Sequence, residues 1–189
     1  MEQFLIKQFG TEKGKELNEL INERYNKFCA NIKNKSKQQE KVLRNTILPR
    51  IAMYQILKEN NYPQSHIMKI MDEHMVISAG IPMRKKYDML DSLPCAYWLF
   101  KTGFTKIVAK SDLWNADINK DKKDEFSVTM KKCFWHDTFQ EYGCPEICKF
   151  ACRCDDITYS NLKHIGFHRT QTLGTGGDCC DFKFTKIKK

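Results

Sequence analysis

The spacing of apolar residues changes near residue 100, and this change limits the possible folds more than any other feature of the chain. Before it, apolar residues recur every three or four positions in otherwise charged segments, which is typical of amphipathic helices. After it, short apolar runs alternate with polar residues and are bounded by polar or glycine-rich turns, as in strands. Helices first, then antiparallel strands with one helix laid on them, predict the α+β class.

The helical half is expected to hold three main helices. The spacing predicts one helix over residues 12–32 and a second over 40–59, in which Pro49 should cause a kink. Ser65 can cap a third helix, which Gly80 and Pro82 should end. Helical pieces are expected to continue to about residue 100, so a single domain over 1–189 would have a helical part at about 1–100 and a cysteine-rich α+β part at about 101–189.

The second half is expected to form a small antiparallel sheet. We predict strands over residues 104–109, 126–131, 164–173 and 179–187, with an exposed loop over 115–125. A helix over 135–155 should be broken near Gly143 and Pro145. The last two strands are joined by the glycine-rich residues 174–178, which is a hairpin signal.

Composition and charge exclude several classes of protein. With 41% hydrophobic residues the chain can bury a core. The net charge of +9 comes mostly from scattered lysines and no nucleic-acid-binding motif is present, so no nucleic-acid partner is expected. The longest apolar run, residues 95–100, is far shorter than the roughly 20 residues of a membrane span. The first residues match neither a signal nor a transit peptide, so a cytoplasmic location without membrane contact is expected.

Cysteine is concentrated in the last third of the chain. Seven of the nine cysteines lie there: Cys133, Cys144, Cys148, Cys152, Cys154, Cys179 and Cys180. An odd count in a chain of this length, in a reducing compartment, favours thiol chemistry, metal ligation or packing over disulfides.

The spacing of three of these cysteines raises the hypothesis of a metal site. Cys144, Cys148 and Cys152 stand at i, i+4 and i+8, and Asp155 lies three residues further on, so one helical face would carry three thiols and a carboxylate. Two of the thiols could share a zinc ion with Cys133 and either His136 or Cys180. Because the chain has no Cys-x-x-Cys pair, we expect no metal ligands and no cofactor, with zinc or another divalent metal as the alternative.

The last two predicted strands bring a charge and a thiol together. Side chains alternate along a strand, so Arg169 should share the inner face of Phe167, and Cys180 that of Phe182. A guanidinium in a partly dry space needs an anionic partner. That partner could be Asp155 or the carboxylate of a bound substrate.

The order of these residues resembles a known family, that of L-2-amino-thiazoline-4-carboxylic acid hydrolase. The resemblance rests on Cys133-Phe-Trp-His, Tyr142-Gly143, Pro145-Glu146, Cys152-x-x-Asp155, Phe167-x-Arg169-Thr170-x-Thr172-Leu173-Gly174-x-Gly176-Gly177 and Cys180-Asp181-Phe182-x-Phe184. A weaker part of it covers Leu43-Arg44, Ile47-Leu48-Pro49 and Ala52-x-Tyr54-x-x-Leu57. The thiols Cys144, Cys148, Cys154 and Cys179 are extra relative to that pattern.

The resemblance implies a cytosolic hydrolase that opens a cyclic amidine, the aminothiazoline ring. A cysteine would attack the amidine carbon, and we favour Cys180 over Cys133 and Cys152 because it lies in the strand beside Arg169. Asp155 or Asp181 would serve as base and then as acid.

The expected partner is a small-molecule substrate with a carboxylate, which Arg169 could hold in a two-pronged contact. The resemblance places Thr172, Gly176 and Gly177 beside it in the substrate-binding part. The competing class is a cysteine-rich module that senses a small molecule or a metal without turnover. The sequence leaves the oligomeric state open.

Overall fold

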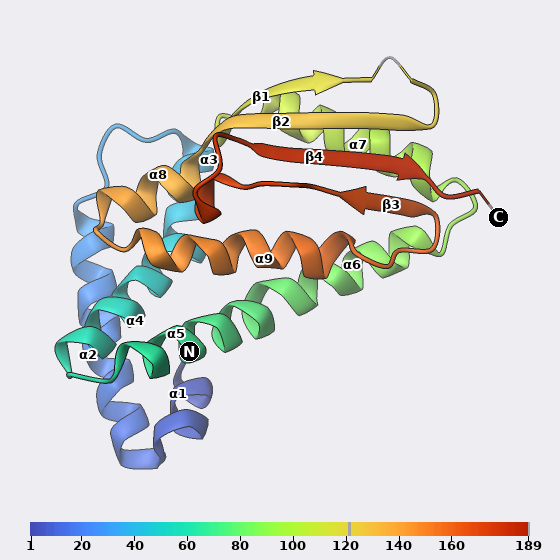
Figure 1. Cartoon of the computed structure of the whole chain (residues 1–189). Helices are drawn as coiled ribbons and strands as arrows, with labels where there is room; N and C mark the ends of the chain where they lie inside the picture. The colour runs from blue at the N-terminus through green and yellow to red at the C-terminus, as the bar shows by residue number, and fades with distance from the viewer. Residues whose placement is uncertain (121, 189) are drawn as a thin grey trace.

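The structure, a computed structural model, describes residues 1–120 and 122–188, and it confirms the α+β class (Figure 1). The helical half contains α1 (Glu2–Phe9), α2 (Thr11–Ala30), α3 (Lys37–Val42), α4 (Leu48–Glu59), α5 (Gln64–Met75), α6 (Ile81–Asp91) and α7 (Ala96–Lys110). The second half contains the strands β1 (Trp114–Asn119), β2 (Glu125–Cys133), β3 (Ile165–His168) and β4 (Cys180–Lys186), with α8 (Phe134–Glu141) and α9 (Cys148–Tyr159) between β2 and β3. No helix in the described ranges is long and apolar enough to cross a membrane.

The four strands form one antiparallel sheet in the order β1-β2-β4-β3. In the pairing of β2 with β4, Met130 is opposite Cys180 and Phe126 is opposite Phe184. Burial alternates along β4, so Cys180 faces the core and the next residue, Asp181, faces away from it. The predicted face of the last strand is therefore confirmed.

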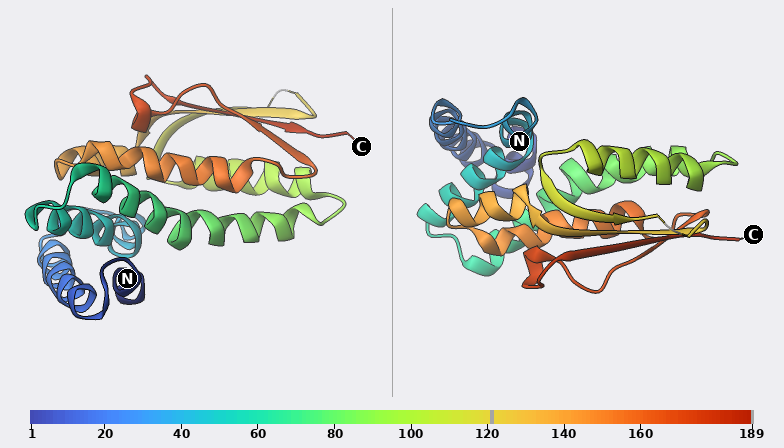
Figure 2. Two further views of the ribbon diagram at one scale, coloured as in Figure 1. Left: turned by 60° about the horizontal axis from the view of Figure 1, so that its bottom comes forward. Right: turned by 90° about the horizontal axis from the view of Figure 1, so that it is seen from above.

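Two helices cover the inner face of the sheet. From α7, the Phe100 ring packs 4.8 Å from the ring of Phe184, and from α9 the Tyr159 ring lies 5.4 Å from it. Helices α5 and α6 join through the π turn Val76–Gly80 into one long rod, the α5–α6 rod. In the left view of Figure 2 the sheet lies on one side of α9 and of this rod, and the N-terminal helices lie on the other. As a result, α9 lies between the sheet and the helical part, and both contribute to its surroundings.

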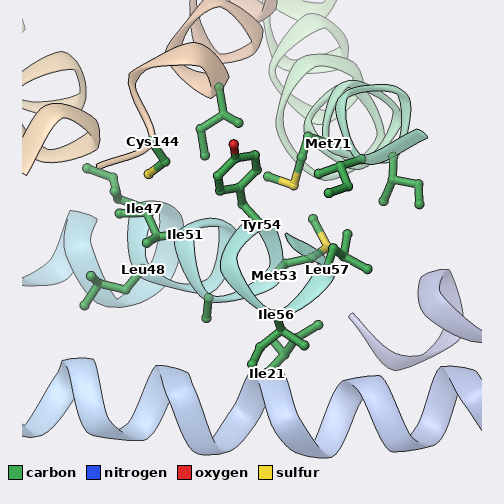
Figure 3. Close-up of a cluster of buried hydrophobic side chains, with 14 of the residues drawn as sticks. Ile21, Ile47, Leu48, Ile51, Met53, Tyr54, Ile56, Leu57, Met71 and Cys144 are labelled. Atoms are coloured by element: carbon green, nitrogen blue, oxygen red, sulfur yellow. The ribbon is translucent and has the colours of Figure 1, made fainter. Parts of the chain in front are cut away.

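The helical part has a core of its own, built around α4. Ile47, Ile51 and Tyr54 are buried there, and Ile21 of α2 packs from below (Figure 3). Cys144 reaches into this core from the segment before α9. This corrects the prediction that Cys144 shares a helical face with Cys148, because a 3₁₀ turn, Pro145–Ile147, separates it from α9.

Two prolines are accommodated by wide helical turns. A π-helical turn, Leu43–Ile47, comes before Pro49, and a second, Val76–Gly80, comes before Pro82. A π turn shifts the backbone hydrogen bonds to five residues back, which makes room for a proline that has no N–H to donate. The first π turn lies directly ahead of Pro49, where a kink was predicted, whereas the predicted helix end at Gly80 and Pro82 is wrong, because the helix runs on into α6.

A buried arginine joins the two wide turns. Arg50 donates to the backbone carbonyl of Thr46 in the first turn and to Ser78 Oγ in the second, the latter over 2.8 Å. Its side chain is buried, and Ser78 in turn donates to the carbonyl of His74. These bonds fix α4 against the α5–α6 rod.

The structure also corrects four predicted boundaries. The strand predicted over 164–173 ends at His168, so Arg169 lies in the connection after β3 and not in the strand. Residues 104–109 belong to α7 instead of a strand, because Phe100, Phe104 and Val108 form an i, i+4 row that packs on the sheet. The predicted loop 115–125 contains most of β1, and its residue 121 lies outside the described residues. The third long helix begins at Gln64 after Pro63, so Ser65 is inside it and does not cap it.

Candidate active site

The candidate site lies where α9 meets the connection between β3 and β4. Cys148 is the first residue of α9 and Cys152 follows one turn later. Cys148 is fully buried, whereas Cys152 is only partly buried and keeps some contact with solvent. The predicted helix over 135–155 is broken here as expected, since α8 ends at Glu141 and α9 starts at Cys148.

The connection between β3 and β4 folds back over the two thiols. Its 3₁₀ turn, Leu173–Thr175, ends at Gly176, whose φ of 88° is in the left-handed region that glycine adopts without strain. A Cβ on Gly174 would lie 2.7 Å from Cys152 Sγ and 2.9 Å from Cys148 Sγ. Both sulfur atoms therefore face the same small space under Gly174.

Donors converge on the Cys152 sulfur. A hydrogen bond from the Cys148 thiol lowers the pKa of Cys152, and although burial acts to raise it, the Thr172 hydroxyl, the Arg169 charge and the Gly174 amide bring it to about 6. The same interaction raises the pKa of Cys148, because that thiol keeps its proton. The pair thus holds one thiolate at neutral pH, on Cys152.

Two other cysteines lie close to this pair and remain thiols. Burial raises the pKa of Cys180 to about 11, although the amide of Leu173 donates to its sulfur over 3.4 Å. Burial likewise raises the pKa of Cys133, at the end of β2, to about 12. The structure therefore brings Cys133, Cys152 and Cys180 together as predicted candidates but distinguishes Cys152 as the charged one.

Arg169 is held by two neighbouring carboxylates of α9. Its Nη2 atom donates to Asp156 Oδ2 over 2.5 Å and to the backbone carbonyl of Cys152 over 2.9 Å. Its Nη1 atom lies 3.6 Å from Asp155 Oδ2 and is buried without a hydrogen-bond partner. Of the two partners that the sequence left open, the side chain finds Asp155, together with Asp156, which sequence reasoning missed.

Asp155 lies beside the thiolate as well. Partial burial raises the pKa of Asp155 above its ordinary value, with the Arg169 charge opposing the shift and the negative Cys152 adding to it. Its side chain keeps 38% exposure, so water reaches the carboxyl and limits the shift. A carboxyl with a raised pKa next to a thiolate can exchange protons at neutral pH.

Asp181 is not part of the thiol cluster. It faces away from the core, and its carboxylate accepts hydrogen bonds from the Thr170 and Gln171 amides, over 2.9 and 2.8 Å. The Thr170 hydroxyl donates to it as well, over 2.6 Å. These contacts fix the start of the connection between β3 and β4.

The predicted substrate-binding residues separate into two groups. Thr172 is buried at the sulfur of Cys152, whereas Gly176 and Gly177 form the far end of the turn, where the Gly177 amide donates to the Thr172 carbonyl over 2.9 Å. In the sequence Gly174 is one residue of the family-like motif, and its closeness to two thiols is a property of the folded turn.

Within residues 1–120 and 122–188, no three or more His, Cys, Asp or Glu side chains are arranged to hold a metal ion. The zinc alternative therefore has no ready-made ligand set among the described residues. Cys154 points elsewhere, donating towards the carbonyls of Met75 and Phe150.

Comparison with known proteins decides the family. The model of the L-2-amino-thiazoline-4-carboxylic acid hydrolase family matches residues 40–184. The chain belongs to this family. The match runs from the helical part to β4, so it includes the candidate active site of this family member and confirms the resemblance seen in the sequence.

The other comparisons add little to the family assignment. Among curated proteins, none matches the chain. Among solved structures, an H-NOX protein from S. oneidensis in the Fe(II)NO ligation state is 12% identical with a TM-score of 0.41, covering 99% of this chain and 95% of its own. The unliganded Fe(II) H-NOX protein from K. algicida is 10% identical with a TM-score of 0.31, covering 100% and 95%. Similarities this low do not support a conclusion about function.

Proposed function

We propose that this chain is a cysteine-dependent hydrolase that opens the ring of 2-aminothiazoline-4-carboxylate or a closely related cyclic amidine. The observation that carries the proposal is the single thiolate on Cys152, set among groups from α9 and from the connection between β3 and β4, and next to Asp155. Membership of the family supports the hydrolase class. The geometry favours Cys152 over Cys180 as the nucleophile, because Cys152 is the charged and more accessible of the two.

The first step is attack on the amidine carbon. When the ring nitrogen is protonated, this carbon is electrophilic, and the Cys152 thiolate adds to it to form a carbon–sulfur bond. The ring carbon–sulfur bond then breaks, because a thiolate leaves more readily than an amide nitrogen. The departing sulfur takes a proton from Asp155, which its raised pKa keeps available.

The second step releases the enzyme. Asp155, now ionised, takes a proton from a water molecule that adds to the same carbon. The bond to Cys152 breaks, the thiolate is restored, and a urea group remains on an open chain that ends in a thiol. One water is consumed for each ring opened, so the balance is that of a hydrolysis.

Arg169 serves this chemistry as a positioning residue. Its guanidinium is already engaged by Asp156 and by the Cys152 carbonyl, so it holds the thiolate-bearing turn of α9 in place. Its charge also stabilises the thiolate. These contacts favour this role over the two-pronged grip on a substrate carboxylate that the sequence suggested.

The proposal is tested by incubating the protein with 2-aminothiazoline-4-carboxylate and a panel of cyclic amidines, with and without chelator, and detecting the ring-opened product by mass spectrometry. We expect Cys152→Ser to lose turnover and Cys180→Ser to keep it, with little change in melting temperature for either variant. An inactive Cys180→Ser beside an active Cys152→Ser would return the role to Cys180. Tight binding without any product would instead support the sensor class.

A further inference from the structure

The two thiols under Gly174 differ in exposure although they share one space. Cys152 keeps contact with solvent, while Cys148 is 1% exposed and lies behind it on the first turn of α9. Since both sulfur atoms lie within 3 Å of the position of a Cβ on Gly174, no side chain separates them. A reagent from solvent would therefore meet Cys152 first, with a second thiol directly behind.

The groups around Cys152 also suit the reduction of an oxygen–oxygen bond. The Thr172 side chain is buried at the sulfur, and the Arg169 guanidinium, which donates to the Cys152 carbonyl, keeps its buried Nη1 atom without a hydrogen-bond partner. When a thiolate attacks a peroxide, negative charge builds up on the leaving oxygen, and nearby hydroxyl and guanidinium donors stabilise it. This arrangement is independent of any ring-opening step.

We propose that Cys152 and Cys148 form a dithiol that reduces hydroperoxides, with Cys152 as the attacking thiol and Cys148 as the resolving one. The inference rests on the assignment of Cys152 as the reactive thiol in the proposed function. It does not depend on the identity of the hydrolase substrate.

The chemistry balances in two steps. The Cys152 thiolate attacks one oxygen of hydrogen peroxide, a sulfur–oxygen bond forms as the oxygen–oxygen bond breaks, and the leaving oxygen takes a proton to become water. The sulfur of Cys148 then attacks the sulfenic acid on Cys152, giving a disulfide and a second water. Sulfur is oxidised, peroxide oxygen is reduced, and an external thiol restores the pair.

The position of Cys148 allows the disulfide to close. Thiols at i and i+4 of an intact helix stand further apart than a disulfide permits, so the backbone has to move. Cys148 is the first residue of α9, and its amide donates to the Pro145 carbonyl of the short 3₁₀ turn before it, so the movement that closes the disulfide is confined to this turn. The next candidates, Cys133 and Cys180, lie on the sheet side of the cluster and are held by strands.

Peptide mapping tests the inference directly. The reduced protein is treated with one equivalent of hydrogen peroxide, blocked with iodoacetamide and digested with trypsin, which cuts after Lys149 and Arg153 and so separates Cys148 from Cys152. We expect the fragment 150–153 to be linked to the fragment 133–149, and dithiothreitol to release it. Because the latter also carries Cys133 and Cys144, fragmentation of the linked peptides in the mass spectrometer identifies Cys148 as the linked residue. A link through Cys133 or Cys180, or oxidation that spares Cys152, would overturn the inference.

Variants sharpen the result. Cys144→Ser is the matched control, because Cys144 is four residues before Cys148 but buried in the helical core, and this variant should give the same link. Cys148→Ser should give no link and should leave a sulfenic acid on Cys152 that dimedone traps. A protein that opens the ring but forms no link contradicts only the peroxide chemistry, whereas a link without ring opening contradicts only the proposed hydrolase.

Discussion

Gly174 lies directly over Cys152, at a distance that leaves no room for a side chain. The methyl carbon of an alanine there would stand 2.7 Å from Cys152 Sγ, which is closer than real Cβ contacts. The reactive sulfur is therefore covered by backbone, whose amide donates to it. The requirement for glycine at this position comes from the site and not from an unusual φ.

Gly174→Ala should accordingly push the 3₁₀ turn away from α9. We expect a loss of stability of about 1–3 kcal/mol from overpacking and a higher pKa for Cys152, whose amide donor moves away. Urea unfolding and pH-dependent alkylation measure the two effects. Gly103→Ala in α7 is the matched control, since a Cβ there meets nothing, and it should stabilise by about 0.5–1 kcal/mol. Equal behaviour of the two variants would contradict the packing described.

The rate of Cys152 alkylation should depend on pH with an unusually low midpoint. With a pKa of about 6, the thiolate forms as pH rises through that value, so the rate with iodoacetamide should increase up to about pH 7 and then level off. Thr172→Val, which removes a donor, should move the midpoint upward. In urea the same cysteine should titrate near the ordinary pKa of about 8.5. A midpoint near that value in the folded protein would remove Cys152 from its proposed role.

Arg169 and Asp156 should be energetically coupled. Asp156 is 47% exposed, so the double-mutant cycle of Arg169→Met and Asp156→Asn should give a modest coupling of about 0.5–1 kcal/mol in thermal unfolding. The control is Lys131 with Asp117, an ion pair 2.6 Å long whose side chains are both mostly exposed and for which no measurable coupling is expected. Additive effects at Arg169 and Asp156 would show that the contact does not contribute to stability.

Asp181→Asn should destabilise the protein without changing the titration of Cys152. Burial acts to raise the pKa of Asp181, but the bonds from Thr170 and Gln171 outweigh it and hold the pKa below its usual value. The stability that these bonds contribute is therefore present above about pH 4 and is lost as pH falls below that. The variant should lose about 1–2 kcal/mol at neutral pH and lack this acid dependence.

The exposed Asp178 of the same connection is the control, because Asp178→Asn should leave stability unchanged. If Asp181→Asn instead kept full stability and abolished ring opening, the catalytic role predicted from the sequence would be supported.

Local rules predicted most of the fold. The helical stripe of residues 12–32 became α2, and the alternation after Glu125 became β2, because each pattern matches the period of its element over many residues. Short segments were harder to predict. Residues 104–109 fit the spacing of a helix and that of a strand, and they are helical because α7 packs against the sheet. The second wide turn, before Pro82, likewise depends on Arg50, which lies some thirty residues earlier in the chain.

The sequence by itself determined the class of the fold and the family, and it proposed several of the residues that line the candidate site. The order of the motifs and the types of their residues are read directly from the sequence. Only the tertiary structure decided which cysteine carries the charge, because the pKa of a thiol depends on donors that reach it through space. Thr172, Gly174 and Arg169 are twenty or so residues from Cys152 along the chain, and the folded connection between β3 and β4 brings them to its sulfur.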